Sequence, residues 1–185
     1  VLEEVSAFVK PGVTTRQVDQ FAAERIRHHG GKSAFLGYRK YPCHTCISVN
    51  DEVVHGLAND RQLRFGDIVS VDCGVIFKGF IGDTARTIAV GGCGVAAQRL
   101  MDVTQQALAQ GVAKAVAGNR VTDISRAIQH YVEGNGYSVV REFVGHGVGR
   151  TMSACRASEC HSELTGSGRA RLAAIPAAEA EKAGK

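Results

Sequence analysis

Two aspartates in apolar surroundings are the residues of this chain best suited to chemistry. Asp72 and Asp83 belong to "VSVDCGVIFKGFIGDTARTIAV", residues 69–90, which is typical of two apolar strands joined by a turn. A turn at 78–79 would place Asp83 opposite Gly74, and a turn one residue earlier would place it opposite Asp72. Both registers put the two carboxyl groups on one side of the hairpin, about 5–8 Å apart. Because two unpaired anions would repel each other there, the pair indicates a site for divalent cations.

Two histidines strengthen this interpretation. His55 precedes a glycine in "VVHGL", and His146 lies between two glycines in "VGHGVGR", where the backbone can come close to a bound group. An Asp, Asp, His set suits ions such as Mn, Fe, Co or Zn. A simpler explanation of the aspartates remains open, in which one pairs with Arg86 or a lysine and the other caps a turn.

The elements that must position these residues alternate between helix and strand. Helical spacing predicts helices within 14–31, 96–116 and 121–137. The first begins with hydroxyl caps, and the first and third end in glycines. The segments 46–50 and 52–56 are predicted to be short strands, so that His55 would lie at a strand end.

The chain also contains an internal echo. A turn, a helix and a glycine stop recur at an offset of 106 residues, which pairs Gly12 with Gly118 and Gly30 with Gly136. A true duplication would give two related α/β halves with a site between them, and chance is the alternative because helix boundaries repeat easily.

Composition places the chain among ordinary globular proteins. Its 185 residues are 44% hydrophobic and 22% charged, with a formal net charge of +4. We expect no membrane span, since no apolar run approaches about 20 residues, and no nucleic-acid specificity, since "RIRHHGGK" fits a solvated helix end. The six cysteines are interpreted as reduced thiols of a cytoplasmic protein. The start at Val1 is interpreted as a cut inside a helix.

Three motifs resemble type I methionine aminopeptidase, a metallopeptidase of the pita-bread fold. They are "CISVNDEVVHGL", "GDIVSVDCGVIFKGFIGDTARTIAVG" and "FVGHGVGRTM", and the resemblance runs from about Val1 to Met152. It implies an α+β pita-bread fold of two pseudo-symmetric α/β halves, here with the second half incomplete. The implied domain boundaries are a partial peptidase domain at 1–152 and an atypical tail at 153–185.

The resemblance implies a role for each metal-site residue. Asp72 would bind one metal with both oxygens, Asp83 would bridge two metals, and His146 would be the histidine ligand. His55 would act in catalysis and in substrate binding outside the metal shell. The family binds two divalent ions per subunit, Co, Mn, Fe or Zn.

It also implies a substrate pocket and partners. Tyr38, Tyr41 and Cys46 would line a pocket for the methionine side chain, and a soft, aromatic wall suits a thioether. Pairing of Cys46 with Cys43 in a structural zinc site is the weaker alternative. The implied substrates are nascent peptides that meet the enzyme at the ribosome, and the implied state is a monomer.

The sequence departs from the family pattern after Met152. Ser153 stands where the family has a further histidine, and the two later glutamate ligands lack their usual strand context. Such an abrupt change is typical of a frameshift or an altered gene end. The tail contains four other glutamates: Glu159, Glu163, Glu179 and Glu181. Glu179 lies at about the expected distance from His146, but its context "PAAEAEK" is typical of a helix and not of an apolar strand.

We therefore expect a member of a dinuclear aminopeptidase family in which loss of two carboxylates impairs activity. Such a site would hold one metal weakly, or none. The alternatives are a non-catalytic pita-bread binding module, an inactive gene fragment, or a proline-specific peptidase or creatine-type hydrolase of the same fold.

Overall fold

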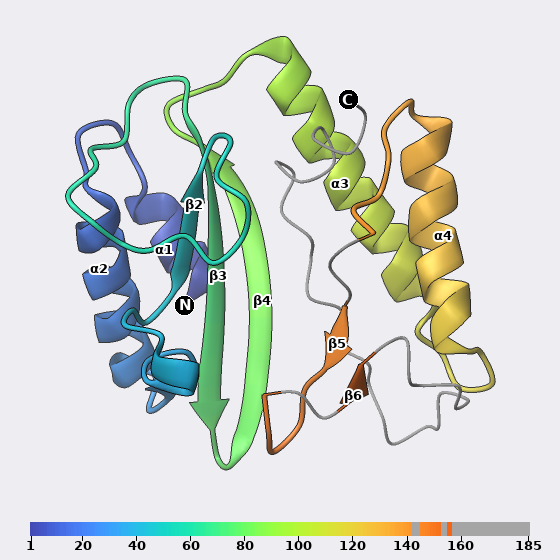
Figure 1. Cartoon of the computed structure of the whole chain (residues 1–185), viewed down its shortest axis with the longest axis horizontal. Coiled ribbons are helices and arrows are strands. Elements are labelled where there is room, and N and C mark those ends of the chain that lie inside the picture. Colours follow the sequence, from blue (N-terminus) through green and yellow to red (C-terminus); the bar gives the residue numbers. More distant parts are fainter. Residues whose placement is uncertain (142–144, 153–154, 157–185) are drawn as a thin grey trace.

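A computed structural model describes residues 1–141, 145–152 and 155–156 of the chain (Figure 1). The tail at 153–185, with its four glutamates, lies outside the described residues except for the short strand β6. The elements, in chain order, are α1 (Leu2–Phe8), α2 (Thr15–His28), β1 (Lys32–Ser33), the 3-10 turn η1 (Tyr38–Lys40), β2 (Cys46–Val49), β3 (Ile68–Phe77), β4 (Phe80–Ala89), α3 (Val95–Lys114), α4 (Val121–Gly134), β5 (His146–Gly147) and β6 (Cys155–Arg156).

The hairpin of β3 and β4 is the centre of the sheet. Phe77 pairs with Phe80, so Lys78 and Gly79 form the turn, and both have positive φ, 49° and 78°. Two consecutive positive φ values are typical of the type I′ turn, whose twist matches that of the strands. Asp83 therefore lies opposite Gly74, which confirms the second of the two predicted registers.

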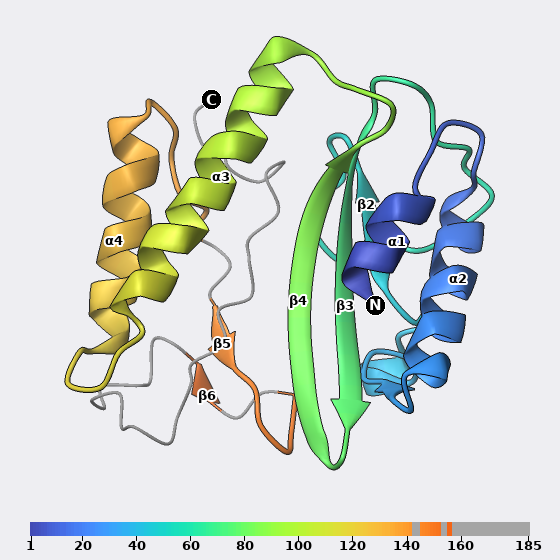
Figure 2. The ribbon, with the colours of Figure 1, turned by 180° about the vertical axis from the view of Figure 1, so that it is seen from behind.

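One face of this sheet is covered by α1 and α2 (Figures 1 and 2). β1 and β2 follow one another along one edge of β3, while β4 occupies the other edge. Side chains alternate between faces along each strand, so Val69, Val71 and Cys73 point away from Asp72. Val69 and Val71 belong to the main core, which also contains Val5, Val9, Val13, Val18, Ala22, Ile47, Val49, Leu63 and Val90.

The predicted helices are confirmed, and α2 shows why its ends are sharp. At its start, the Thr14 hydroxyl accepts a hydrogen bond from the Gln17 amide, and the Gln17 side chain accepts one from the Thr14 amide. At its end, the amides of Gly30 and Gly31 donate to the carbonyls of Arg27 and Ile26. Gly30 has a φ of 74°, so this is a Schellman motif that needs glycine.

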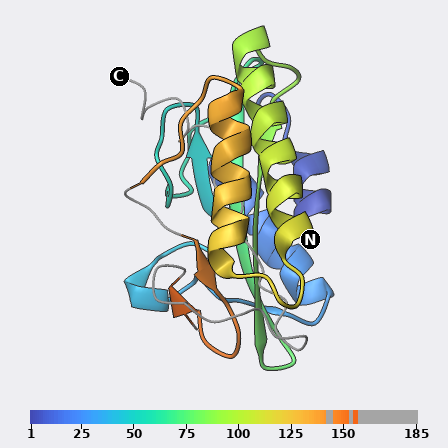
Figure 3. The same cartoon turned by 90° about the vertical axis from the view of Figure 1, so that its right-hand side faces the viewer.

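Helix α4 repeats this arrangement at the offset seen in the sequence. It has the same length as α2, 14 residues, and is followed by Gly136, where φ is 83° and the amide donates to the carbonyl of Glu133. At its start, Asp123 accepts a hydrogen bond from the Arg120 amide, as Gln17 does in α2. The echo therefore extends from sequence to helix length and caps. Helices α3 and α4 lie side by side (Figure 3), with Gly111 of α3 against Ile128.

The prediction of a strand at 52–56 is wrong. These residues form turns and irregular backbone, and His55 has a φ of 60°. The reason is that the backbone of Gly56 approaches β2 directly, since a Cβ there would lie 2.1 Å from the carbonyl oxygen of Ile47. The amide of Ile47 donates to the carbonyl of Gly56, and the amide of Gly56 donates to the Ser48 hydroxyl, so Gly56 is held against β2 without forming a strand.

No helix within the described part of the chain is long and apolar enough to cross a membrane.

Candidate functional site

The two aspartates lie on the sheet face that α1 and α2 leave uncovered. Asp83 is buried, with 8% of its surface exposed, and its Oδ1 has no hydrogen-bond partner. Burial raises the pKa of Asp83, an effect opposed by a hydrogen bond with Asp72 and by the charge of His146. A buried carboxylate oxygen without a partner is costly, and a cation is one group that would satisfy it.

His146 is brought to this face by the return of the chain from α4. Its Nε2 lies 3.7 Å from Oδ2 of Asp83, and its side chain is 30% exposed. Two contacts hold the segment there: the Ile81 amide donates to the carbonyl of Gly149 at 2.7 Å, and the guanidinium of Arg150 lies 5.1 Å from the ring centre of Phe80. The separation of 3.7 Å is an ion-pair distance, too long for a hydrogen bond.

The chemical types of the donor groups fit a divalent cation, although these groups do not form a complete ligand set within the described residues. Two carboxylates and an imidazole suit borderline divalent ions, and the Oδ1 of Asp83 lacks any other partner. Among the described residues, no group of three or more His, Cys, Asp or Glu side chains is already gathered closely enough to hold an ion. Asp72, Asp83 and His146 thus have the chemical types of metal ligands, while the described part of the chain does not gather them into a complete site.

An apolar cluster lies beside the carboxylates. Cys46 of β2 pairs with Asp72, and its side chain is buried with those of Ala34 and Phe35. Three partly buried side chains pack against this group: Tyr41, Ile81 and Met152. We call these six residues the apolar cluster, and it contains two of the three predicted pocket residues.

The third predicted pocket residue, Tyr38, lies elsewhere. It is 41% exposed in η1, and the guanidinium of Arg39 lies 5.5 Å from its ring centre. The described contacts do not place it in the apolar cluster.

Sequence reasoning missed Phe35, Ile81 and Met152. The position of Ile81 could have been found, because it precedes Asp83 by two residues on a strand and so shares its face. Phe35 covers Gly74, where a Cβ would lie 2.4 Å from the aromatic ring. No local pattern marks Phe35 or Met152, since both reach the cluster from distant segments.

The thiol of Cys46 is suited to a neutral wall. Burial, chiefly, raises the pKa of Cys46 to about 12, and burial raises that of Tyr41 as well. A thiol that stays protonated is a small, polarizable apolar group and a poor metal ligand. The burial of Cys46 among the side chains of the apolar cluster is consistent with the pocket interpretation.

His55 is exposed in the loop that follows β2, and its backbone is held from two sides. Gly56, the next residue, accepts hydrogen bonds from the Ile47 amide and from the Tyr41 hydroxyl, both at 2.9 Å. The loop carrying His55 is therefore tied to β2 and to the apolar cluster through the carbonyl of Gly56.

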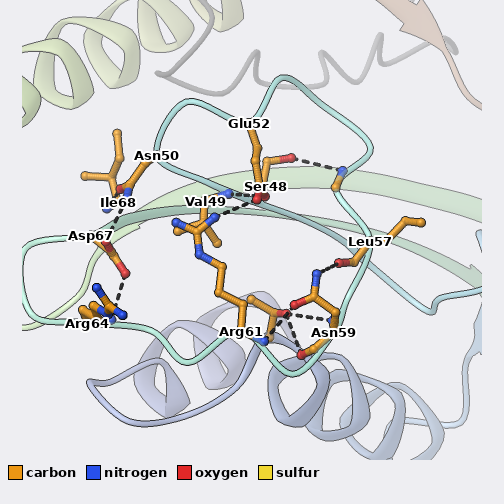
Figure 4. A network of polar contacts seen from close by, with 12 residues as sticks. Ser48, Val49, Asn50, Glu52, Leu57, Asn59, Arg61, Arg64, Asp67 and Ile68 are labelled. Carbon is orange, nitrogen blue, oxygen red and sulfur yellow. Dashed lines mark hydrogen bonds and ion pairs between the residues drawn. The ribbon is translucent and has the colours of Figure 1, made fainter.

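A hollow away from the aspartates lies in the loop between β2 and β3, with a volume of about 540 Å³. Its lining residues are Asn50, Asp60, Arg61, Gln62, Arg64 and Asp67. Most of their polar groups satisfy one another or nearby backbone (Figure 4): Asn50 donates to Asp67 at 2.8 Å, and Arg61 pairs with Glu52 at 2.7 Å. The network stabilises the loop and needs no ligand.

Comparisons with known proteins identify the family of the chain. Residues 1–170 match the family model described as metallopeptidase family M24. The methionine aminopeptidase of Clostridium perfringens is 49% identical over 142 residues, which cover 77% of this chain and 57% of that protein. The chain thus spans somewhat more than half the length of this curated relative.

Solved structures are similar as well. The crystal structure of methionine aminopeptidase from Rickettsia prowazekii matches 93% of this chain and 67% of that chain, with a TM-score of 0.81 and 36% identity. Prolidase from Pyrococcus furiosus matches with a TM-score of 0.72 at 20% identity, a likeness of fold alone. The predicted pita-bread architecture is confirmed by these neighbours.

Proposed function

We propose that this chain, which belongs to metallopeptidase family M24, is a metal-dependent aminopeptidase that removes methionine from the N-termini of nascent polypeptides. The observation that carries the proposal is the unpartnered, buried Oδ1 of Asp83, beside Asp72 and on the same sheet face as the apolar cluster. A cation-binding pair next to a soft apolar wall suits a substrate with a thioether side chain and a free amino group. The methionine aminopeptidase relatives support the same reaction.

Membership in a metallopeptidase family implies dependence on a divalent metal. We propose Asp72, Asp83 and His146 as its ligands in this chain, and we propose that one ion binds rather than two. When bound, such an ion would polarise the scissile carbonyl and lower the pKa of water. The buried carboxylate of Asp83 anchors the site, because a charged group in this position gains most from a counter-charge.

The remaining residues act on the substrate. The apolar cluster takes the methionine side chain and excludes water from it, with Cys46 and Tyr41 as proposed contacts. Tyr38 lies outside the apolar cluster, and we propose that its exposed ring contacts the peptide there. His55, exposed in the loop that follows β2, is proposed to hold the scissile amide by hydrogen bonding.

The test is methionine release by the purified chain. The protein is stripped with chelator, supplied with Mn, Co, Fe or Zn, and incubated with Met-Ala-Ser, and free methionine is measured by amino-acid analysis. We expect metal-dependent release that falls by more than about 100-fold in Asp83→Asn, since changes to groups behind a metal ligand alone cost 10–100-fold. Asp67→Asn is the matched control, because Asp67 is a hydrogen-bonded aspartate of the polar loop network.

Binding of Met-Ala-Ser without release, equal in the chain and in Asp83→Asn, would overturn the enzyme proposal in favour of the binding module. Equal release by both proteins would show that Asp83 is not a ligand. Metal content after dialysis, measured by mass spectrometry, decides between one ion and two. Gel filtration tests the proposed monomer, and co-sedimentation with ribosomes tests that proposed site of action.

A further inference from the structure

Asp19 of α2 is a buried carboxylate that serves a loop instead of its own helix. Its exposed fraction is 8%, and one oxygen, Oδ1, accepts three hydrogen bonds. The donors are the amide of His44 at 3.0 Å, and the amide and hydroxyl of Thr45, both at 2.7 Å. Hydrogen bonds to a carboxylate are about twice as strong as neutral ones, so this group fixes residues 44–45 firmly.

The residues that Asp19 holds are central to the candidate site. Thr45 is fully buried and directly precedes Cys46, which pairs with Asp72. The Tyr41 hydroxyl lies 3.3 Å from the carbonyl oxygen of Thr45 and 2.9 Å from that of Gly56. A continuous path of hydrogen bonds therefore runs from α2 to the apolar cluster.

The same path reaches His55. The carbonyl of Gly56 accepts from Tyr41 and also from Ile47, the second residue of β2. Because His55 is joined to Gly56 and has a positive φ of 60°, its direction depends on where that peptide is held. A residue other than glycine adopts a positive φ uncommonly, so the contacts of the Gly56 peptide help to hold His55 in this conformation.

We propose that Asp19 is a positioning residue, which holds residues 41–46 and the peptide of Gly56 against β2. In this way it sets the affinity of the site for a methionine side chain. The inference rests on the proposed function for the identity of the side chain, and on geometry alone for the positioning. A buried carboxylate is an expensive way to stabilise a core, since apolar residues of similar size often do so better. All three of its described hydrogen bonds go to residues 44–45, within the segment 41–46 that we call the pocket loop.

The test uses variants that keep the shape of the site. Asp19→Asn keeps the accepting oxygen and lowers its charge, Thr45→Val removes one donor, and Thr45→Ser keeps that donor. Asp67→Asn is again the control, because Asp67 also accepts a backbone amide, that of Arg64, outside the pocket loop.

The first readout is native-state hydrogen exchange followed by NMR. We expect the amides of Thr45 and Ile47 to exchange at least about 10-fold faster in Asp19→Asn and Thr45→Val, while those of Val69 and Val71 keep their rates. Thr45→Ser should restore slow exchange. A uniform change at all four amides, or none, would overturn the inference, because a merely structural carboxylate would alter global opening only.

The second readout is binding of L-methionine by isothermal titration calorimetry. We expect the Kd to rise about 10-fold in Asp19→Asn and Thr45→Val, and to be unchanged in Asp67→Asn and Thr45→Ser. In the peptide assay, KM should rise more than kcat falls. If the unaltered chain binds no methionine, the proposed function fails, and the exchange rates still decide whether Asp19 positions the loop.

Discussion

Nε2 of His146 lies 3.7 Å from Oδ2 of Asp83, although helices α3 and α4 separate β5 from β4 in the chain. The hydrogen bond from the Ile81 amide to the carbonyl of Gly149 holds the segment that carries His146 against β4, two residues before Asp83. The candidate site therefore lies where the second half of the chain comes back to the first. A metal that binds both side chains would link the halves.

Asp83→Asn should raise the stability of the metal-free protein. Burial disfavours the charged form of Asp83, whereas an Asn side chain carries no charge and its amide can donate to Asp72, the present hydrogen-bond partner of Asp83. We expect a gain of about 1 kcal/mol in the free energy of unfolding, or about 2–4 °C in Tm. Thermal melts in chelator measure it.

Adding Mn or Zn should reverse the order of the two Tm values, so that the unaltered chain melts at a higher temperature than Asp83→Asn. The unaltered chain gains about 2.7 kcal/mol when the free ion is at 100 times its Kd, and Asp83→Asn gains much less. A metal-induced rise of the same size in both proteins would show that Asp83 is not a ligand.

Gly56→Ala should move His55 and destabilise the fold. The added Cβ would lie 2.1 Å from the carbonyl oxygen of Ile47, which is backbone and cannot step aside. We expect a loss of about 1–3 kcal/mol, typical of overpacking, measured by urea unfolding. Gly134→Ala is the control, since nothing lies within 4 Å of a Cβ there and alanine favours a helix end by up to about 1 kcal/mol. Equal stability of the two variants would contradict the close approach.

Glu4 should make stability depend on acid pH. Hydrogen bonds from Arg25 and His29 lower the pKa of Glu4 from 4.5 to about 2. Since the folded pKa is the lower one, the stabilisation is present above pH 4.5 and is lost as the pH falls toward 2. Glu4→Gln should therefore weaken the dependence of the urea midpoint on pH between pH 5 and pH 2.5. Glu3→Gln, a change on the same helix, is the control and should keep that dependence. Because these groups are accessible, 0.5 M salt should shrink the difference, and a difference that salt leaves unchanged would argue against this ion pair.

Gly30→Ala and Gly136→Ala should cost similar free energies. Both glycines follow a 14-residue helix and have a positive φ, 74° and 83°, and an added Cβ would meet at most an ordinary contact. The cost is then conformational, about 1–2 kcal/mol for each. Chemical denaturation of the two variants measures it. A clearly unequal pair would weaken the interpretation that the helices are copies of one unit.

Sequence pattern was sufficient where a structure is governed by local chemistry. The three predicted helices, the hydroxyl cap of α2, the glycines that follow α2 and α4, and the alternation that puts Asp72 and Asp83 on one face all follow from residues within a few positions of one another. Sequence pattern could not distinguish the two possible registers of the hairpin, because the observed turn requires Lys78 to adopt a positive φ that a lysine side chain disfavours. Pairing along the whole length of β3 and β4 outweighs that local cost.

Long-range contacts could not be predicted in the same way. The run at 52–56 has an apolar, strand-like pattern, yet the close approach of Gly56 to Ile47 holds it as a loop. Phe35 and Met152 join the apolar cluster from separate segments, and Asp19 reaches the pocket from a helix. Each depends on how elements pack, which the spacing of residues along one element does not reveal.

The Lys78–Gly79 turn also bears on the order of folding events. Two-residue closure costs little chain entropy, and hairpins form in about 1–10 μs, so the two carboxylates can meet before the chain from α4 returns. An ion present during refolding would then be held first by the aspartates, and it should accelerate folding more than it slows unfolding. Stopped-flow refolding with and without Zn tests this, and an effect confined to the unfolding rate would show that the aspartates come together late. On this view the hairpin is the nucleus around which His146 completes the site.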